Sequence, residues 1–242
     1  MDIILNGASG RMGMVITKKV NDGYQDAKIV AAVDRNHGQY DSLSSFNGKG
    51  DVIIDFSNHV ATKDLLDYAT SHHTPVVIAT TGHTPEEKDL ILEASKKIPV
   101  FFSYNMSIGI AALSELAKKA ASLMKDAEIE IVEIHHDQKL DAPSGTALLL
   151  ADSIKEVRPD SHLVIGRNGH AKREKNDIGI SSIRIGNVVG VHEIIISSGL
   201  ETLTLKHEAH DRSLFADGAL VAAEFIAKVS NPGLYTMKDL VK

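Results

Sequence analysis

The first hundred residues alternate short apolar runs with stretches of helical periodicity. Turn-forming residues bound each apolar run, and the runs cover residues 3–5, 29–33, 52–56, 75–79 and 100–102. Such runs with helices between them are typical of parallel strands covered on both faces. Thr84, Pro85 and Glu87 mark one helix start, because they supply an N-cap hydroxyl, a first-position proline and a carboxylate three residues past the cap. The pattern predicts an α/β fold with an N-terminal Rossmann-like parallel sheet domain.

The pattern changes after residue 105. A long helix is expected over residues 107–124, and from residue 129 onward apolar and polar residues alternate over longer strands. Residues 197–201 are expected to form the turn of a hairpin, and the polar stretch 168–177 a surface loop. This alternation predicts a second, α+β domain that carries an open, mostly antiparallel sheet. A final apolar helix is expected over residues 214–229.

Composition narrows the class of protein. The chain has 242 residues, of which 43% are hydrophobic and 24% charged, as in an ordinary globular protein. A net charge of −6 with scattered Lys and Arg argues against a nucleic-acid partner and favours a small-molecule one. The absence of cysteine excludes disulfides and thiolate sites and is consistent with a reducing compartment. With no room for a signal peptide before the first strand and no membrane-length apolar run, we expect a cytoplasmic protein without a membrane partner.

A glycine loop lies between the first expected strand and the first expected helix. Gly7, Gly10 and Gly13 are spaced as G-x-x-G-x-x-G. Glycines there let the backbone approach a pyrophosphate, while the free amides and the dipole of the helix start stabilise its charge. This spacing departs from the commoner G-x-G-x-x-G, and strand-to-helix turns of this kind also occur without ligands. The loop alone is therefore a weak signal for a dinucleotide.

The second expected strand strengthens this signal. It ends at Asp34, where a Rossmann fold places the carboxylate that accepts hydrogen bonds from the adenine ribose. Arg35 follows, and an arginine at that point can pair with a 2′-phosphate. The two residues favour NAD and NADP respectively, and a solvated surface arginine is an equally good interpretation of Arg35.

The densest chemistry lies between residues 133 and 147. His135 and His136 end a strand and should face opposite sides, so they are not expected to share one role. Residues 144–146 begin a helix with hydroxyls and backbone amides that can bind an anion, and Lys139 on the preceding loop could add an ammonium. The alternative is structural, with half-exposed sheet histidines and an ordinary helix cap.

A metal site is a weaker interpretation of the same histidines. The candidate ligands are His135, His136 and Asp137, or His207 and His210. Adjacent strand residues diverge and no helical H-E-x-x-H pair is present, so we expect no metal.

Five segments carry a resemblance to a known family. They are NGASGRMG at 6–13, ATTGHT at 79–84, SYNMSIG at 103–109, EIHHDQKLDAPSGTA at 133–147 and GLYTMKDL at 233–240. Together they resemble the dihydrodipicolinate reductase family, also called 4-hydroxy-tetrahydrodipicolinate reductase. The resemblance covers the chain from end to end, and its histidine segment is highly specific.

The resemblance implies an NAD(P)H-dependent oxidoreductase of the diaminopimelate route to lysine, which reduces a cyclic dicarboxylate to tetrahydrodipicolinate. It implies a dinucleotide-binding domain of residues 1–106 plus 212–242. Residues 107–211 would form a substrate-binding domain whose open sheet builds a homotetramer, with a cleft closing between the domains.

The resemblance also assigns residues to NADH or NADPH and to the substrate. The cofactor-binding residues would be Gly7, Ala8, Ser9, Gly10, Arg11, Met12, Asp34, Arg35, Ala79, Thr80, Thr81, Ser103, Tyr104, Asn105 and Met106. The substrate carboxylate pocket would contain His136, Lys139, Ser144, Gly145 and Thr146. His135 would be the proton donor and Lys139 the second catalytic residue.

Two alternatives remain open at this point. Another Rossmann-type reductase of an amino-acid precursor would share the glycine loop but would not need two carboxylate-binding features. A dinucleotide sensor without turnover would gain nothing from a proton donor beside an anion pocket.

Overall fold

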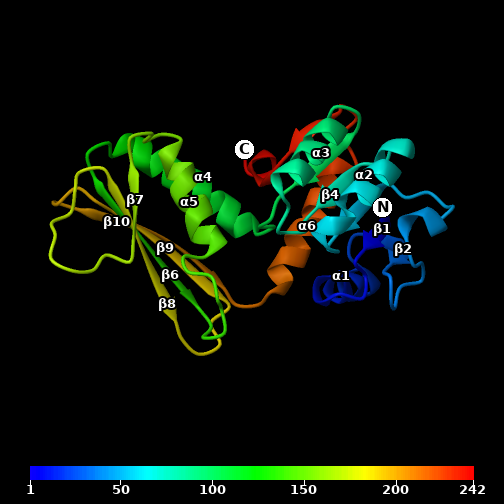
Figure 1. Cartoon of the computed structure of the whole chain (residues 1–242), viewed down its shortest axis with the longest axis horizontal. Coiled ribbons are helices and arrows are strands. Elements are labelled where there is room, and N and C mark those ends of the chain that lie inside the picture. The colour runs from blue at the N-terminus through cyan, green and yellow to red at the C-terminus, as the bar shows by residue number, and fades with distance from the viewer. The chain divides into compact units, whose positions relative to one another are not determined.

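A computed structural model describes residues 1–242 of the chain. The chain folds into two compact units, one containing Met1–Ser107 and Ser213–Leu240 and the other Ile108–Arg212 (Figure 1). Both ends of the sequence therefore contribute to the first unit.

A six-stranded parallel sheet forms the centre of the first unit. Its order is β2-β1-β3-β4-β5-β11, and every neighbouring pair is parallel. The strands are β1 (Asp2–Asn6), β2 (Lys28–Val33), β3 (Val52–Asp55), β4 (Val76–Ile78), β5 (Pro99–Phe102) and β11 (Gly233–Tyr235). The parallel sheet predicted from five apolar runs is confirmed. The short, partly exposed β11 was not predicted.

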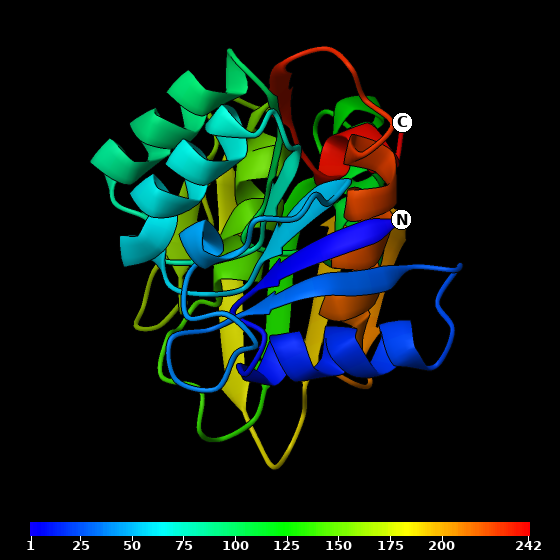
Figure 2. The ribbon, with the colours of Figure 1, turned by 90° about the vertical axis from the view of Figure 1, so that its right-hand side faces the viewer.

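Helices cover both faces of this sheet. Figure 2 shows α1 (Arg11–Asn21) and α6 (Ser213–Ile226) on one face and α2 (Thr62–Ser71) and α3 (Pro85–Ser95) on the other. The predicted start of α3 is confirmed, because Thr84 and Glu87 form a complete capping box. Short 3₁₀ turns complete the unit at η1 (Leu43–Ser45), η2 (His59–Ala61) and η3 (Met237–Leu240).

The strand order places a crevice at the carboxyl ends of the strands of this sheet. The chain passes from β1 to β2 on one side and continues with β3 on the other, so the order reverses between β1 and β3. In open α/β sheets, ligands bind outside the carboxyl ends of the strands at such a reversal. The loops after β1 and β3 are therefore where the first unit should hold a ligand.

The second unit contains a five-stranded sheet with two helices. The sheet order is β10-β9-β6-β8-β7, formed by β6 (Glu128–His135), β7 (His162–Ile165), β8 (Asp177–Arg184), β9 (Gly190–Ser197) and β10 (Thr202–Ala209). The predicted hairpin of β9 and β10 is confirmed. The expectation of a mostly antiparallel sheet was wrong in detail, because β6 pairs in parallel with β8, and β8 with β7. Two antiparallel and two parallel pairs make the sheet mixed.

The helices α4 (Ile108–Leu123) and α5 (Gly145–Lys155) lie on one side of this sheet (Figure 1). Strand alternation directs Ile129 and Ile131 of β6 into the core beneath them, together with Ile194 and Ile196 of β9. The same alternation directs Glu133 and His135 to this face, at the end where α5 begins. Ionisable groups thus occupy core positions at one end of the sheet.

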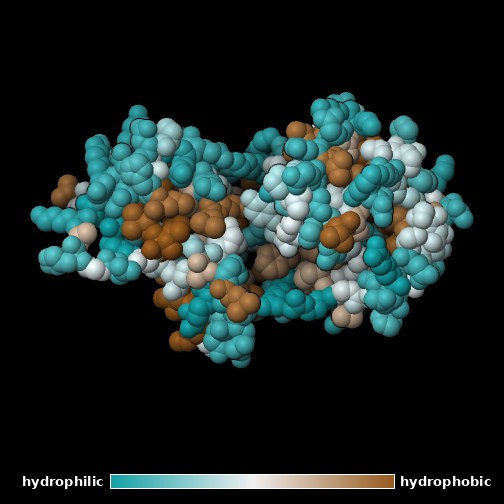
Figure 3. Space-filling model, in the orientation of Figure 1, coloured by the Kyte–Doolittle hydropathy of each residue, from teal (hydrophilic) through white to brown (hydrophobic).

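The surface has both polar and apolar areas. In the view of Figure 3, apolar side chains gather on the second unit, among a mostly hydrophilic surface. The uncovered face of its sheet contributes Ile183 and Ile185, which are 43% and 59% exposed. No helix of the structure has the length and apolar character needed to span a bilayer.

Candidate active site

The glycine loop after β1 is fixed by its own backbone. Gly7 has φ +82°, and its N–H and that of Ala8 donate to the Val33 carbonyl at 2.9 and 3.1 Å. A Cβ atom at Gly7 would lie 2.6 Å from the carbonyl carbon and oxygen of Phe56. Only glycine therefore fits both the left-handed conformation and the close approach of β3.

The loop leads directly into the first turn of α1. Gly10 is the N-cap, and no side chain caps the helix. A Cβ atom at Gly13 would lie 2.2 Å from the Gly7 carbonyl oxygen, so Gly13 lets the helix pack onto the loop. The predicted residues Ser9, Arg11 and Met12 thus surround a helix start without a side-chain cap, which suits an anion.

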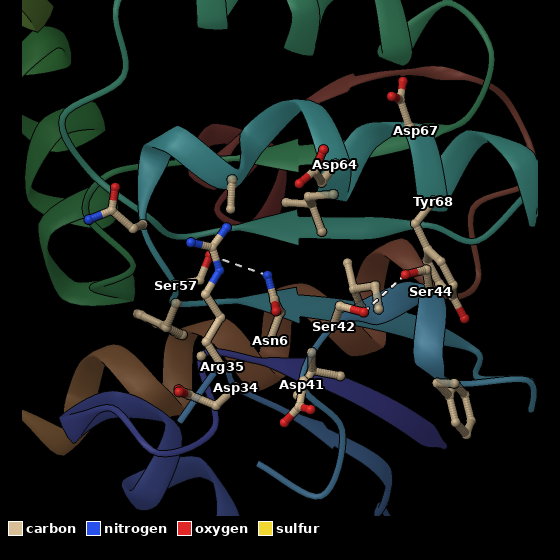
Figure 4. A pocket seen from close by; sticks show the side chains of 18 of the residues that line it. Asn6, Asp34, Arg35, Asp41, Ser42, Ser44, Ser57, Asp64, Asp67 and Tyr68 are labelled. Carbon is tan, nitrogen blue, oxygen red and sulfur yellow. Dashed lines mark hydrogen bonds between the residues drawn. The ribbon is translucent and has the colours of Figure 1, made fainter. Parts of the chain in front are cut away.

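A cavity of about 950 Å³ opens beside this loop, lined by Asn6, Gly7 and Gly10 and by residues from the ends of β2 and β3 (Figure 4). Figure 4 shows Asp34 and Arg35 among its lining side chains. The Asp34 carboxylate accepts from the Ser9 N–H at 3.3 Å, and hydrogen bonding by Ser9 lowers the pKa of Asp34. The structure thus brings the glycine loop, Asp34 and Arg35 together around one cavity.

A buried carboxylate that sequence reasoning missed lies next to this cavity. Asp55 ends β3 and accepts from Asn6 Nδ2 at 2.7 Å, Ser57 Oγ at 2.6 Å and Thr80 Oγ1 at 2.6 Å. Burial raises the pKa of Asp55, while these hydrogen bonds oppose the rise. Asp55 thereby connects the ends of β1 and β3 to the loop after β4. Asp55 was missed in the sequence because it lies within the apolar run over residues 52–56.

The other predicted cofactor residues follow β4 and β5, at the same carboxyl ends of the parallel strands. Ala79 and Thr80 are buried, whereas Thr81 is exposed. The segment after β5 joins the end of β4 through the Ser103 N–H, which donates to the Ile78 carbonyl at 3.1 Å. It then continues as Tyr104, which is exposed, then Asn105 and then Met106, whose side chain is buried. The Met106 side chain therefore packs inside the first unit, and its carbonyl group lies against Gly218 of α6.

The second unit gathers its own group of predicted residues around the end of β6. His135 Nδ1 lies 2.5 Å from Glu133 Oε2, and Glu133 is fully buried. Burial lowers the pKa of His135, and the hydrogen bond and charge of Glu133 oppose that shift. A Cβ atom at Gly190 would lie 3.1 Å from His135 Nε2, so this glycine leaves room beside the ring.

Ser144 connects this histidine region to the first turn of α5. Its N–H donates to Glu133 Oε1 at 3.1 Å, and its hydroxyl accepts from the Ala147 N–H at 3.2 Å. The same hydroxyl lies 3.1 Å from His192 Nε2. Burial lowers the pKa of His192 to about 3, so this histidine is neutral, and its tautomer decides whether Ser144 or His192 donates in this contact.

The rest of the predicted anion pocket lies beyond Ser144. Gly145 is open, because a Cβ atom there would meet nothing within 4 Å, and Thr146 follows in the first turn of α5. Lys139 Nζ contacts both carboxylate oxygens of Asp141, at 2.7 and 2.9 Å. An anion bound by the Lys139 ammonium would therefore share it with Asp141, which had not been considered as a site residue from the sequence.

The two adjacent histidines have different partners, as the strand alternation predicted. His135 contacts Glu133, whereas His136 Nε2 lies 3.1 Å from Arg212 Nη2. Arg212 and His192 were both missed, because they reach the site from distant parts of the chain. The structure contains no group of three or more His, Cys, Asp or Glu side chains that could hold a metal ion.

Family models match both halves of the chain. The model for the N-terminus of dihydrodipicolinate reductase matches residues 1–106, and the model for its C-terminus matches residues 109–241. Curated relatives include the 4-hydroxy-tetrahydrodipicolinate reductases of Clostridium novyi (strain NT), 45% identical, and of Caldanaerobacter subterraneus subsp. tengcongensis, 44% identical. Each comparison covers 99% of this chain and 98% of the relative.

Solved structures share the fold. A dipicolinate-bound dihydrodipicolinate reductase from Paenisporosarcina sp. TG-14 matches with a TM-score of 0.79 at 24% identity, over 99% of both chains. A probable dehydrogenase from Thermotoga maritima matches with a TM-score of 0.62 at 12% identity, over 99% of this chain and 92% of the other. At these identities the likeness concerns the fold alone.

Proposed function

Because the chain belongs to the dihydrodipicolinate reductase family, we propose that it reduces 4-hydroxy-tetrahydrodipicolinate (dihydrodipicolinate) to tetrahydrodipicolinate. The electron donor is NADH or NADPH, and the product feeds the diaminopimelate route to lysine. The single observation that carries the proposal is the arrangement at the end of β6. There the buried Glu133 carboxylate contacts both His135 and the start of α5, so a proton donor lies beside an anion pocket.

The first unit fits a dinucleotide. The Gly7 backbone leaves no room for a side chain, and the uncapped start of α1 opens on a cavity that Asp34 and Arg35 also line. We assign the pyrophosphate to residues 7–12 and the adenosine end to Asp34 and Arg35. The loops after β4 and β5 would hold the nicotinamide, which supplies a hydride when bound.

The second unit would hold the dicarboxylate substrate. The amides of Gly145 and Thr146 with the Lys139 ammonium would bind one carboxylate, since helix starts and charged donors both favour anions. His136, beside Arg212, would add a polar contact. Ser144 would support this pocket as the cap of α5, because its hydroxyl already bonds within the protein.

His135 would deliver the proton that completes the reduction. Its Nδ1 faces Glu133, so Nε2 is the nitrogen that exchanges a proton with the substrate. A histidine suits this step because its ordinary pKa lies near neutral pH, and at His135 the Glu133 carboxylate opposes the lowering of that pKa by burial. General acids contribute roughly 10²- to 10⁴-fold.

Assembly, location and the division of labour between the units are also proposals. The uncovered face of the second sheet carries exposed Ile183 and Ile185, which supports a homotetramer built through that face. We assign the first unit to the dinucleotide and the second to substrate and assembly. The cysteine-free composition supports a cytoplasmic location.

Steady-state assays test the proposed function. Purified protein with freshly generated 4-hydroxy-tetrahydrodipicolinate should oxidise NADH or NADPH, followed by the loss of reduced-nicotinamide absorbance. His135→Ala should lower kcat by roughly 10²-fold or more while the calorimetric affinity for NADH stays unchanged. Turnover of a semialdehyde or imino acid instead would indicate another reductase, and cofactor binding without any turnover would indicate a sensor.

A further inference from the structure

Glu133 is a fully buried carboxylate to which the proposed reaction assigns no step. Strand alternation places it on the face of β6 that also carries Ile129 and Ile131, where an apolar residue would be expected. A buried charge is costly unless hydrogen bonds and an opposite charge compensate it. Its partners therefore indicate what it does.

Arg184 of β8 supplies the opposite charge. Its Nη1 donates to Glu133 Oε2 at 2.9 Å and its Nη2 donates to Glu133 Oε1 at 2.8 Å, which is a bidentate pair. Burial acts to raise the pKa of Glu133, but the hydrogen bonds from Arg184 and His135 outweigh burial, and the pKa falls to about 2. Glu133 is thus ionised at any pH at which the enzyme would work.

The Glu133 carboxylate also accepts hydrogen bonds from two groups of the proposed site. Oε2 accepts from His135 Nδ1 at 2.5 Å, and Oε1 accepts from the Ser144 N–H at 3.1 Å. An ionised carboxylate only accepts, so it requires the proton of His135 to lie on Nδ1. One side chain thereby sets the tautomer and direction of the imidazole and ties it to the first turn of α5.

The charges around His135 make Glu133 decisive for its protonation. Arg184 on β8 and Lys139 on the loop after β6 are positive and disfavour the imidazolium. His192 on β9 is neutral, because burial lowers its pKa to about 3. Glu133 is the negative group that opposes the two cations and burial.

We propose that Glu133, held by Arg184, is a positioning residue that orients the proton donor His135, keeps it protonatable and couples it to the substrate pocket. This inference rests on the proposed role of His135. It adds a carboxylate and an arginine through which that role is maintained. Neither residue needs to touch the substrate.

The test is Glu133→Gln, measured by NMR titration of the His135 imidazole and by the pH profile of kcat/KM. Loss of the negative charge should lower the pKa of His135 by about one unit or more, which is a tenfold loss of protonated donor. The alkaline limb of kcat/KM should move to lower pH by the same amount. NADH affinity should not change, since Glu133 belongs to the second unit.

Two variants complete the design. Glu128→Gln removes a carboxylate from the exposed start of the same strand and should leave both readouts at their wild-type values. Glu133→Asp keeps the charge but withdraws it from the ring, so kcat should fall while the pKa of His135 shifts less than in Glu133→Gln. Glu133→Asp also serves if the glutamine variant does not fold.

The outcomes separate this inference from the proposed function. An unchanged His135 pKa in folded Glu133→Gln would overturn the positioning role, whatever the activity, and so would an unchanged kcat in folded Glu133→Asp. Full activity of His135→Gln would instead refute the proton-donor role. The two failures can be told apart, because the NMR titration of His135 in the Glu133 variants does not depend on turnover. A parallel fall of the His135 pKa and of the alkaline limb supports both.

Discussion

Replacing Gly13 by alanine tests the packing of the glycine loop against α1. A Cβ atom at Gly13 would lie 2.2 Å from the Gly7 carbonyl oxygen and 2.6 Å from that of Ala8. Both are backbone atoms, so no side chain can rotate away to make room. The loop itself is held, because the N–H groups of Gly7 and Ala8 both donate to the Val33 carbonyl.

Whether Gly13→Ala lowers or raises the free energy of unfolding distinguishes an effect of packing from an effect of helix propensity. In a helix without such neighbours, Gly→Ala stabilises by roughly 0.5–1 kcal/mol. Overpacking costs about 1–3 kcal/mol, and loosening the two hydrogen bonds to Val33 would add about 0.5–1.5 kcal/mol each. We therefore expect Gly13→Ala to lower the free energy of unfolding by about 1–5.5 kcal/mol, after the propensity gain is subtracted from these costs.

Urea denaturation followed by circular dichroism measures this change, and calorimetric titration with NADH measures binding. Gly10 is the matched position, because it is the N-cap and a Cβ atom there would meet only the Gly7 carbonyl oxygen, at 3.2 Å. Gly10→Val should therefore remain folded but lose NADH affinity. A Gly13→Ala protein as stable as the wild type would refute the packing argument, and unchanged NADH affinity of folded Gly10→Val would refute the cofactor assignment.

Two further predictions concern ligand charge. Arg35→Ala should weaken NADPH more than NADH in calorimetric titrations, because Arg35 lines the cavity and can pair with a 2′-phosphate; an equal effect on both would make it a surface residue. Lys139→Ala should weaken binding of pyridine-2,6-dicarboxylate by about tenfold or more, whereas Asp141→Asn should strengthen it by releasing the ammonium. Unchanged affinity of the Lys139 variant would place the pocket elsewhere.

The sequence predicted the first sheet well because its signal is local. Each apolar run is bounded by turn residues, and a parallel sheet buried on both faces requires such runs. The three residues of β11 were missed because they are too few to form an apolar run, and in the structure Leu234 is exposed while Gly233 and Tyr235 are only partly buried. Asp55 was missed for the opposite reason, because the run over 52–56 predicted burial without showing what a buried carboxylate would bind.

In the second sheet, local sequence patterns do not predict which strands pair. Alternation predicts which residues face the core, but it does not say which strand lies alongside or in which direction. The parallel pairing of β6 with β8 therefore could not be predicted from it. That pairing sets Arg184 opposite His135 and within reach of Glu133, 51 positions earlier in the chain. The arginine of the proposed site follows from strand register, which no spacing in the sequence reveals.

One signal for Glu133 was nevertheless present in the sequence. Residues 129, 131, 133 and 135 share a face of β6, and the first two are isoleucines that enter the core. The same period therefore assigns Glu133 and His135 to buried positions, where an ionisable side chain persists only with compensating partners. A strand whose inward positions change from apolar to ionisable thus marks where the core ends and a site begins. In β6 the alternation alone indicates that the histidine has a buried partner, and only the identity of the arginine depends on how the strands pair.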